Sequence, residues 1–179
     1  MTAYKDGDPT TIRQLYGRRQ GHALRDQQVD LVEKLLPQNG VVGALQHVRD
    51  QHLGNVRLHM GNALDVLERI PDGALSFVYL LHPDPWPKAR HAKRRFMNHG
   101  PVDLIAAKLK PGGEFRFGTD HPVYLEWAMM IMNRRDEFDW LCESPKNWMV
   151  RPGGWPETRY EAKARRQGHD VWYFRYRRK

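Results

Sequence analysis

An almost continuous apolar run, Ala74 to Leu81, constrains the fold of this chain more than any other segment. Ser76 is its one clear polar interruption, and the run has the length of a strand. A strand of this composition is typical of a parallel sheet with both faces covered, because neither set of alternating side chains is kept for solvent. The run is also too short to span a bilayer. We therefore expect an α/β protein with this strand inside the sheet.

Helical and strand patterns alternate around this run. Apolar residues at helical spacing predict helices over Arg25–Leu36, Ala44–Leu53, Pro101–Lys110 and Pro122–Arg134, and a short helix through Leu64, Leu67 and Ile70. Strands are predicted over Val56–Met60, Glu114–Phe117 and Val171–Tyr176, with turns at Pro71–Gly73 and Pro111–Gly113. This alternation favours a three-layer α/β fold with a mostly parallel sheet, and the length of 179 residues favours a single domain over 1–179.

Charge and cysteine content narrow the classes of partner and compartment. A net charge of +8 favours a polyanion such as nucleic acid, because bound cations release counterions from it; a mildly basic protein without such a partner is the alternative. The positive charge gathers near the N-terminus (Arg13, Arg18, Arg19, Arg25), over Lys88–Arg95 and over Lys163–Lys179. Residues 1–9 lack the apolar core of a signal peptide, and Cys142 is a lone cysteine, so we expect a cytoplasmic protein with no membrane partner.

Polar residues follow three of the predicted strands. Ligands of open α/β sheets bind beyond the carboxyl ends of the strands. This rule selects Gly61-Asn62 after the first predicted strand, His82 to Trp86 after the apolar run, and Gly118-Thr119-Asp120 after the next strand.

The segment His82-Pro83-Asp84-Pro85-Trp86-Pro87-Lys88 is the most distinctive of the three. Proline fixes its own φ and forces its predecessor into an extended conformation, so we expect Asp84 to project from a rigid loop. A group of cations follows this loop: Lys88, Arg90, His91, Lys93, Arg94 and Arg95. These cations could bind phosphates beside the carboxylate, or they could belong to a polar loop that leads into a solvated helix.

Several short motifs together resemble one family. In chain order they are Tyr16–Arg19, Pro83–Trp86 with the basic run to Arg95, Lys110–Gly113, Thr119-Asp120, Thr158–Glu161 and Gly168-His169. In this order they are similar to the bacterial tRNA (guanine-N7)-methyltransferases. The resemblance implies a Rossmann-like class I methyltransferase fold, S-adenosylmethionine as methyl donor, no metal, and a variable-loop guanine of tRNA as substrate. We expect a monomer, with no obligatory protein partner.

The resemblance implies roles for individual residues. Asp84 would be the catalytic carboxylate and, with Asn62, a contact of the donor. The guanosine or its tRNA would be contacted by Lys88, Asp120, Thr158, Arg159, Tyr160 and Glu161, and the phosphates by Arg90, Lys93, Arg94 and Arg95. Two positions depart from the pattern, since relatives usually have an acid at Asn62 and an aromatic or apolar residue at His82. An amide can still hydrogen-bond a purine edge.

An acidic residue suits this chemistry. Guanine N7 already carries a lone pair, but methylation leaves positive charge on the ring, which a carboxylate can stabilise as it develops. Plainer interpretations stay open for three residues: Asp120 as an N-terminal helix cap, Glu161 as a surface residue paired with Arg165, and Trp86 as a core residue instead of a stacking platform for a base.

The family resemblance also implies a segment that the sequence lacks. Class I methyltransferases hold the donor with a glycine-rich turn after the first strand and an acid that ends the second. Pro37 is followed directly by Gln38–Gly43, which resembles the family just beyond the second strand, so a βα unit of ~30 residues or more is absent. Gly40 and Gly43 do not replace it, because no strand precedes them and no acid follows at the expected distance.

Three explanations of this gap are open. The natural protein contains further residues between Pro37 and Gln38, the protein carries a deletion, or it is a degenerate relative. We favour the first, because loss of a strand and its helix would leave unpaired sheet edges and a hole in the core. The degenerate relative corresponds to a rival function, that of a non-catalytic RNA-binding protein that kept the basic face and lost the donor site.

Overall fold

The structure is a computed structural model that describes residues 30–33, 38–155 and 157–179. Its first element, β1 (Asp30–Glu33), pairs in parallel with the strand formed by the apolar run, and Asp30 lies opposite Phe77. The helix predicted over Arg25–Leu36 is therefore wrong for 30–33, and the rest of that range lies outside the described residues. A short apolar run cannot be assigned to helix or strand by periodicity alone, and here an available edge of the sheet decides.

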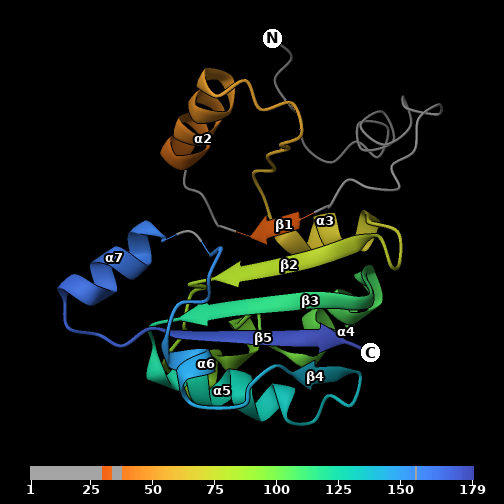
Figure 1. Ribbon diagram of the computed structural model, residues 1–179, viewed down its shortest axis with the longest axis vertical. Coiled ribbons are helices and arrows are strands. Elements are labelled where there is room, and N and C mark those ends of the chain that lie inside the picture. The colour runs from red at the N-terminus through yellow and green to blue at the C-terminus, as the bar shows by residue number, and fades with distance from the viewer. Residues whose placement is uncertain (1–29, 34–37, 156) are drawn as a thin grey trace.

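The sheet has five described strands in the order β1-β2-β3-β5-β4. After β1 these are β2 (Leu75–Leu81), β3 (Leu109–Thr119), β4 (Phe138–Trp140) and β5 (Trp172–Arg178). β1, β2 and β3 are parallel, whereas β5 pairs antiparallel with both β3 and β4, so among the described strands it alone runs against the others (Figure 1). The expected α/β class is confirmed, and the apolar run forms an interior strand.

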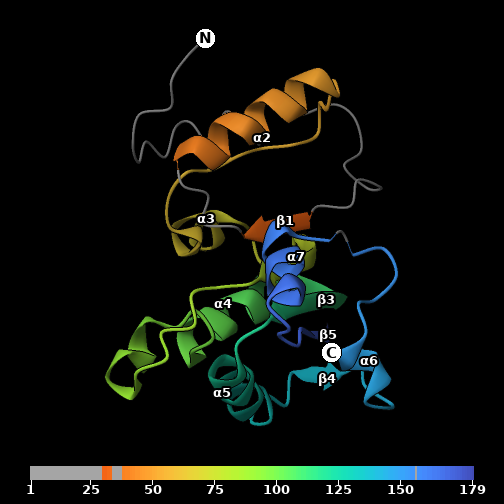
Figure 2. The ribbon, with the colours of Figure 1, turned by 90° about the vertical axis from the view of Figure 1, so that its left-hand side faces the viewer.

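The described helices lie mainly on one side of this sheet. They are α2 (Gln38–Asp50), α3 (Ala63–Arg69), the 3-10 helix η1 (Ala89–Arg94), α4 (His99–Lys108), α5 (Pro122–Met132), α6 (Lys146–Met149) and α7 (Arg159–Arg166). α3, α4 and α5 cover one face, and α7 lies beyond the carboxyl ends of β2 and β3 (Figures 1 and 2). Within the described ranges, no helix is long and apolar enough to cross a bilayer.

Two further sequence predictions differ from the structure. Val56–Met60 forms no strand, because its alternating side chains find no partner strand, and Met60 is 59% exposed. Pro111–Gly113 is not a separate turn but a bulge within β3. Leu75 and Phe77 of β2 pair with Leu109 and Glu114 of β3, so the intervening residues loop out, and Gly112 has a φ of +79°.

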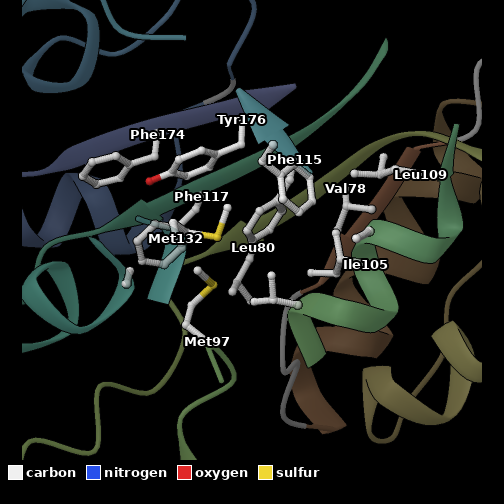
Figure 3. Packing of buried hydrophobic residues seen from close by; sticks show 14 of the residues in the cluster. Val78, Leu80, Met97, Ile105, Leu109, Phe115, Phe117, Met132, Phe174 and Tyr176 are labelled. Carbon is white, nitrogen blue, oxygen red and sulfur yellow. The ribbon is translucent and has the colours of Figure 1, made fainter. Parts of the chain in front are cut away.

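The main core lies between the sheet and the α3–α5 layer. It includes Val78, Leu80, Phe115 and Phe117 from β2 and β3, Ile105 from α4 and Met132 from α5 (Figure 3). Burial of each such side chain contributes about 1.5–3 kcal/mol relative to exposure. A smaller cluster of Trp155, Ala164, Val171 and Tyr173, with Tyr79 and Leu81 against it, packs on the opposite face. Side chains therefore pack on both faces of β2, β3 and β5, and this packing fixes the positions of the strand ends.

α2 stands apart from the sheet in both views (Figures 1 and 2). The helix predicted over Ala44–Leu53 is confirmed in part, although α2 begins at Gln38 and ends at Asp50. Its apolar side chains are largely uncovered, with Val42 63% and Leu45 53% exposed. α2 therefore presents apolar surface that the described residues do not bury.

Candidate active site

The ends of β2 and β3 bring two polar side chains together. His82 follows β2 and Asp120 follows β3, and the parallel pairing of these strands places both residues at one edge of the sheet. His82 Nδ1 lies 3.1 Å from Asp120 Oδ1, and the His82 backbone N–H donates to the Gly118 carbonyl at 2.8 Å. The His82 side chain is 5% exposed and that of Asp120 33%. The carboxylate is thus held from the protein side and open to a ligand on the other.

The electrostatics keep Asp120 ionised. The hydrogen bond from His82 lowers the pKa of Asp120, and this effect outweighs partial burial, which raises it; the charge of His82 and the nearby His169 also favour the carboxylate. The N-terminal cap considered for Asp120 is not observed, because the cap of α5 is His121.

Asp84 lies on a strained loop between two residues with positive φ. His82 has a φ of 50° and Trp86 a φ of 41°, a region that non-glycine residues rarely adopt and that tends to occur at functional sites. Asp84 is exposed and forms no hydrogen bond or ion pair with any described residue. Its carboxylate projects from the loop at the sheet edge, as expected from the neighbouring prolines, and is available to a ligand.

Arg95 anchors this loop. It is 5% exposed, and its guanidinium donates to the carbonyls of Pro85 at 3.2 Å and Trp86 at 3.0 Å. The same group lies 4.7 Å from the ring centroid of Trp127 in α5. The phosphate contact expected of Arg95 does not fit this position, because its donors face the backbone of the protein. A buried arginine within a basic run cannot be distinguished in the sequence from its exposed neighbours.

The other cations of this run face solvent. Lys88 precedes η1, and Arg90, Lys93 and Arg94 lie on it; all four are exposed. The Arg94 guanidinium lies over the Trp86 ring at 4.7 Å, and the ring is partly exposed instead of plugging the core. The loop and η1 therefore form a basic surface beside Asp84, which agrees with the expected phosphate contacts of these four residues without testing them.

Thr158 and Glu161 build the start of α7. Thr158 Oγ1 accepts from the Glu161 backbone N–H at 3.0 Å as the N-terminal cap. The Glu161 side chain is buried, and its Oε1 accepts from Tyr173 and from Arg165 at 3.2 Å. The pairing with Arg165 is confirmed, but the surface position considered for Glu161 is wrong. The substrate contact expected of Glu161 does not fit this position either, because its carboxylate is buried and bonded within the protein. Burial, followed by the bond to Glu161, raises the pKa of Tyr173 to about 12.

A pocket of about 490 Å³ opens between the start of α5 and α7. Asp120 and Tyr160 line it together with Lys163, His169 and Trp172. Asp120 and Tyr160 are among the residues predicted for the site. Lys163 is not, because the sequence marks it only as one of the C-terminal group of cations. Arg159 and Tyr160 are exposed at the start of α7, and the Tyr160 ring stacks on that of His82 at 6.2 Å.

The donor side is less complete. Asn62 caps α3, and its Oδ1 accepts from the Leu64 backbone N–H at 3.1 Å. Its contact with a donor stays a prediction. The expectation that no strand precedes Gly40 and Gly43 is wrong, because β1 does. Both glycines nevertheless lie inside α2, and no glycine occurs in the sequence between β1 and α2. The sequence therefore has no glycine-rich turn between β1 and α2.

Solved structures share this fold. An rRNA methylase from Streptococcus thermophilus aligns with a TM-score of 0.52 and 9% identity, over 84% of this chain and 73% of that chain. A "putative methyltransferase" from Streptococcus mutans, solved in complex with SAH, aligns with a TM-score of 0.53 and 9% identity, over 85% and 76%. The fold is that of the class I methyltransferases.

Sequence relatives define the family more closely. The profile of a family described as "Putative methyltransferase" matches residues 32–174. The tRNA (guanine-N(7)-)-methyltransferase of Sphingopyxis alaskensis is 54% identical over all of both chains, and that of Zymomonas mobilis is 50% identical over 99% of this chain and 100% of its own. The chain belongs to the tRNA (guanine-N7)-methyltransferase family.

The alignment with the Sphingopyxis relative also bears on the segment predicted to be missing after Pro37. It spans 237 positions for the Sphingopyxis relative, whereas this chain has 179 residues, so at least 58 positions of the alignment have no counterpart here. The location of these positions after Pro37 stays a prediction from the sequence.

Proposed function

We propose that this protein transfers a methyl group from S-adenosylmethionine to N7 of a guanine in the variable loop of tRNA. The observation that carries the proposal is the exposed, unpaired Asp84 carboxylate, in a chain of this family. It lies on a loop that follows His82, the partner of Asp120, and that leads into the cations of η1. We place the protein in the cytoplasm, where tRNA is modified, and expect it to act as a monomer.

Asp84 acts on the guanine ring. The N7 lone pair is available without removal of a proton, so no general base is required for the attack. Positive charge develops on the ring as the methyl group arrives, and a fixed carboxylate stabilises that charge more than it stabilises the neutral ring. Arg95 contributes indirectly, because its hydrogen bonds to the carbonyls of Pro85 and Trp86 hold the loop from which Asp84 projects.

The guanine itself fits the pocket beside Asp120. The Asp120 carboxylate can accept from the N–H groups on the guanine edge, and the exposed ring of Tyr160 offers a stacking face at the pocket wall. Lys88, Arg90, Lys93 and Arg94 then face the phosphates of the tRNA. Buried Glu161 and capping Thr158 support this surface by fixing α7, and exposed Arg159 extends it.

S-adenosylmethionine supplies an electrophilic methyl group on a sulfonium. We propose that Asn62 and Asp84 contact this donor, and that the remainder of its site lies in positions that the relatives have and this chain lacks after Pro37. The uncovered apolar face of α2 agrees with a missing neighbour at this place.

Methyl transfer to unmodified tRNA tests the proposal. Labelled donor, tRNA and protein are incubated, and N7-methylguanine is located by borohydride reduction followed by aniline cleavage of the strand. Label at a single variable-loop guanine is the expected result. The rival function is that of an RNA-binding protein without activity. It predicts that the protein binds tRNA, that calorimetry detects no binding of S-adenosylmethionine, and that no methyl group is transferred.

A further inference from the structure

We propose that His82 is a positioning residue that orients the Asp120 carboxylate toward the substrate guanine, an inference that rests on the proposed function. Nothing in the reaction requires His82 to touch the substrate. Its role follows from its position, because it contacts or belongs to three segments that each carry part of the site: the loop with Asp84, the end of β3 and the start of α7.

Both the backbone and the side chain of His82 are restricted by their surroundings. Its backbone N–H bonds the Gly118 carbonyl at 2.8 Å, which extends the β2–β3 pairing by one residue. Its φ of 50° turns the chain sharply at this point, and its side chain is 5% exposed. A buried ring on a strained, hydrogen-bonded backbone has little freedom to rotate, so it can hold a partner in one orientation.

The bond to Asp120 uses one oxygen of the carboxylate. Nδ1 lies 3.1 Å from Oδ1, so the contact with His82 occupies one of the two carboxylate oxygens. Because the pKa of Asp120 is lowered, the carboxylate is the acceptor and Nδ1 carries the proton. His82 does not use Oδ2, so this oxygen can accept from a ligand in the pocket that Asp120 lines.

The ring of His82 also reaches α7. It lies parallel to the Tyr160 ring, with centroids 6.2 Å apart and an interplanar angle of 21°. Tyr160 and Asp120 line the same pocket, so His82 contacts one residue from each of its two sides. Through these contacts, the loop that carries Asp84, the end of β3 and the start of α7 are held at a fixed spacing.

Two substitutions separate the hydrogen bond from the ring contact. His82→Asn keeps an N–H donor near the position of Nδ1 and loses the ring, whereas His82→Phe keeps the ring and loses the donor. Relatives usually have an aromatic or apolar residue at this position, so the proposal concerns the Asp120 site of this chain in particular. If His82 positions Asp120 here, His82→Phe lowers kcat on tRNA by roughly 10- to 100-fold with KM within about 3-fold, because misorientation affects the chemical step while phosphate contacts set binding. His82→Asn restores kcat to within about 5-fold of wild type.

A second measurement is independent of methyl transfer. Carboxyl ¹³C NMR of the full chain follows the titration of Asp120. Its other titratable neighbours in the pocket are present in every variant: His121, Tyr160, Lys163, His169 and Asp170. We expect the Asp120 pKa to rise in His82→Phe and to stay lower in His82→Asn. Unchanged kcat in His82→Phe, or equal impairment of both variants, overturns the proposal. If wild type transfers no methyl group, the proposed function fails, and the NMR titration still decides whether His82 holds Asp120.

Discussion

The guanidinium of Arg94 lies 4.7 Å from the centroid of the Trp86 ring, whereas the guanidinium of the adjacent Arg95 donates to the carbonyl of Trp86 and is buried. Two neighbouring arginines thus contact the same loop in different ways, one at a side-chain ring and the other at the backbone. Arg94 belongs to the exposed basic surface and Arg95 to the framework, so their substitutions should have separable effects.

Arg94→Ala should weaken tRNA binding and leave the fold intact. Loss of one phosphate contact reduces the slope of log K against log salt by about 1, and loss of the exposed cation–π contact costs about 1 kcal/mol of stability or less. Filter binding over a salt series measures the slope. The matched control is Arg134→Ala, which removes an exposed arginine just after α5. An unchanged slope would place the tRNA footprint elsewhere.

Arg95→Ala should act on stability instead. Its removal leaves two backbone carbonyls without their charged donor and uncovers Trp127, which should lower the free energy of unfolding by about 3 kcal/mol. Urea denaturation measures this change. At a temperature where the variant is folded, its salt slope for tRNA should equal that of wild type; a reduced slope would show that Arg95 contacts phosphate after all.

Tyr173 should make stability depend on alkaline pH. Its pKa is raised from 10.0 to about 12, so the protonated phenol is favoured in the folded state. This contribution is fully present below pH 10 and is lost as the pH rises from 10 toward 12, a fall on the order of 2 kcal/mol. Tyr173→Phe should show a shallower fall in chemical denaturation over this window. Parallel curves for the two proteins would contradict the buried contact with Glu161.

Features with a strong local cause could be predicted from the sequence. The apolar run became an interior strand, the prolines set Asp84 on a projecting loop, and Asp120 stands at the neighbouring strand end. Predictions failed where a distant partner decides. β1 formed because an edge of β2 was available to it, and Val56–Met60 found no such edge. Nothing local shows that Glu161 is buried, because Tyr173 meets it from another element.

The gap after Pro37 leads to a prediction about the natural protein. If further residues lie between Pro37 and Gln38, its intact mass exceeds the 21.1 kDa of this chain, and it binds S-adenosylmethionine in calorimetry. Those residues should also cover Val42 and Leu45, and protect them from hydroxyl-radical labelling. A mass of 21.1 kDa from the natural source would instead show that the chain is complete without them.

The most direct test of the account is methyl transfer by Asp84→Asn. Asparagine keeps the size of the side chain and removes its charge, and Asp84 supports no contact among the described residues, so the fold and tRNA affinity should be unchanged. Loss of a group that stabilises developing charge should lower kcat by about 10²–10³-fold or more. Single-turnover transfer of labelled methyl to saturating tRNA, with full donor, measures this rate. A loss of that size at unchanged tRNA affinity is the predicted result, and a rate equal to that of wild type would contradict the role of Asp84.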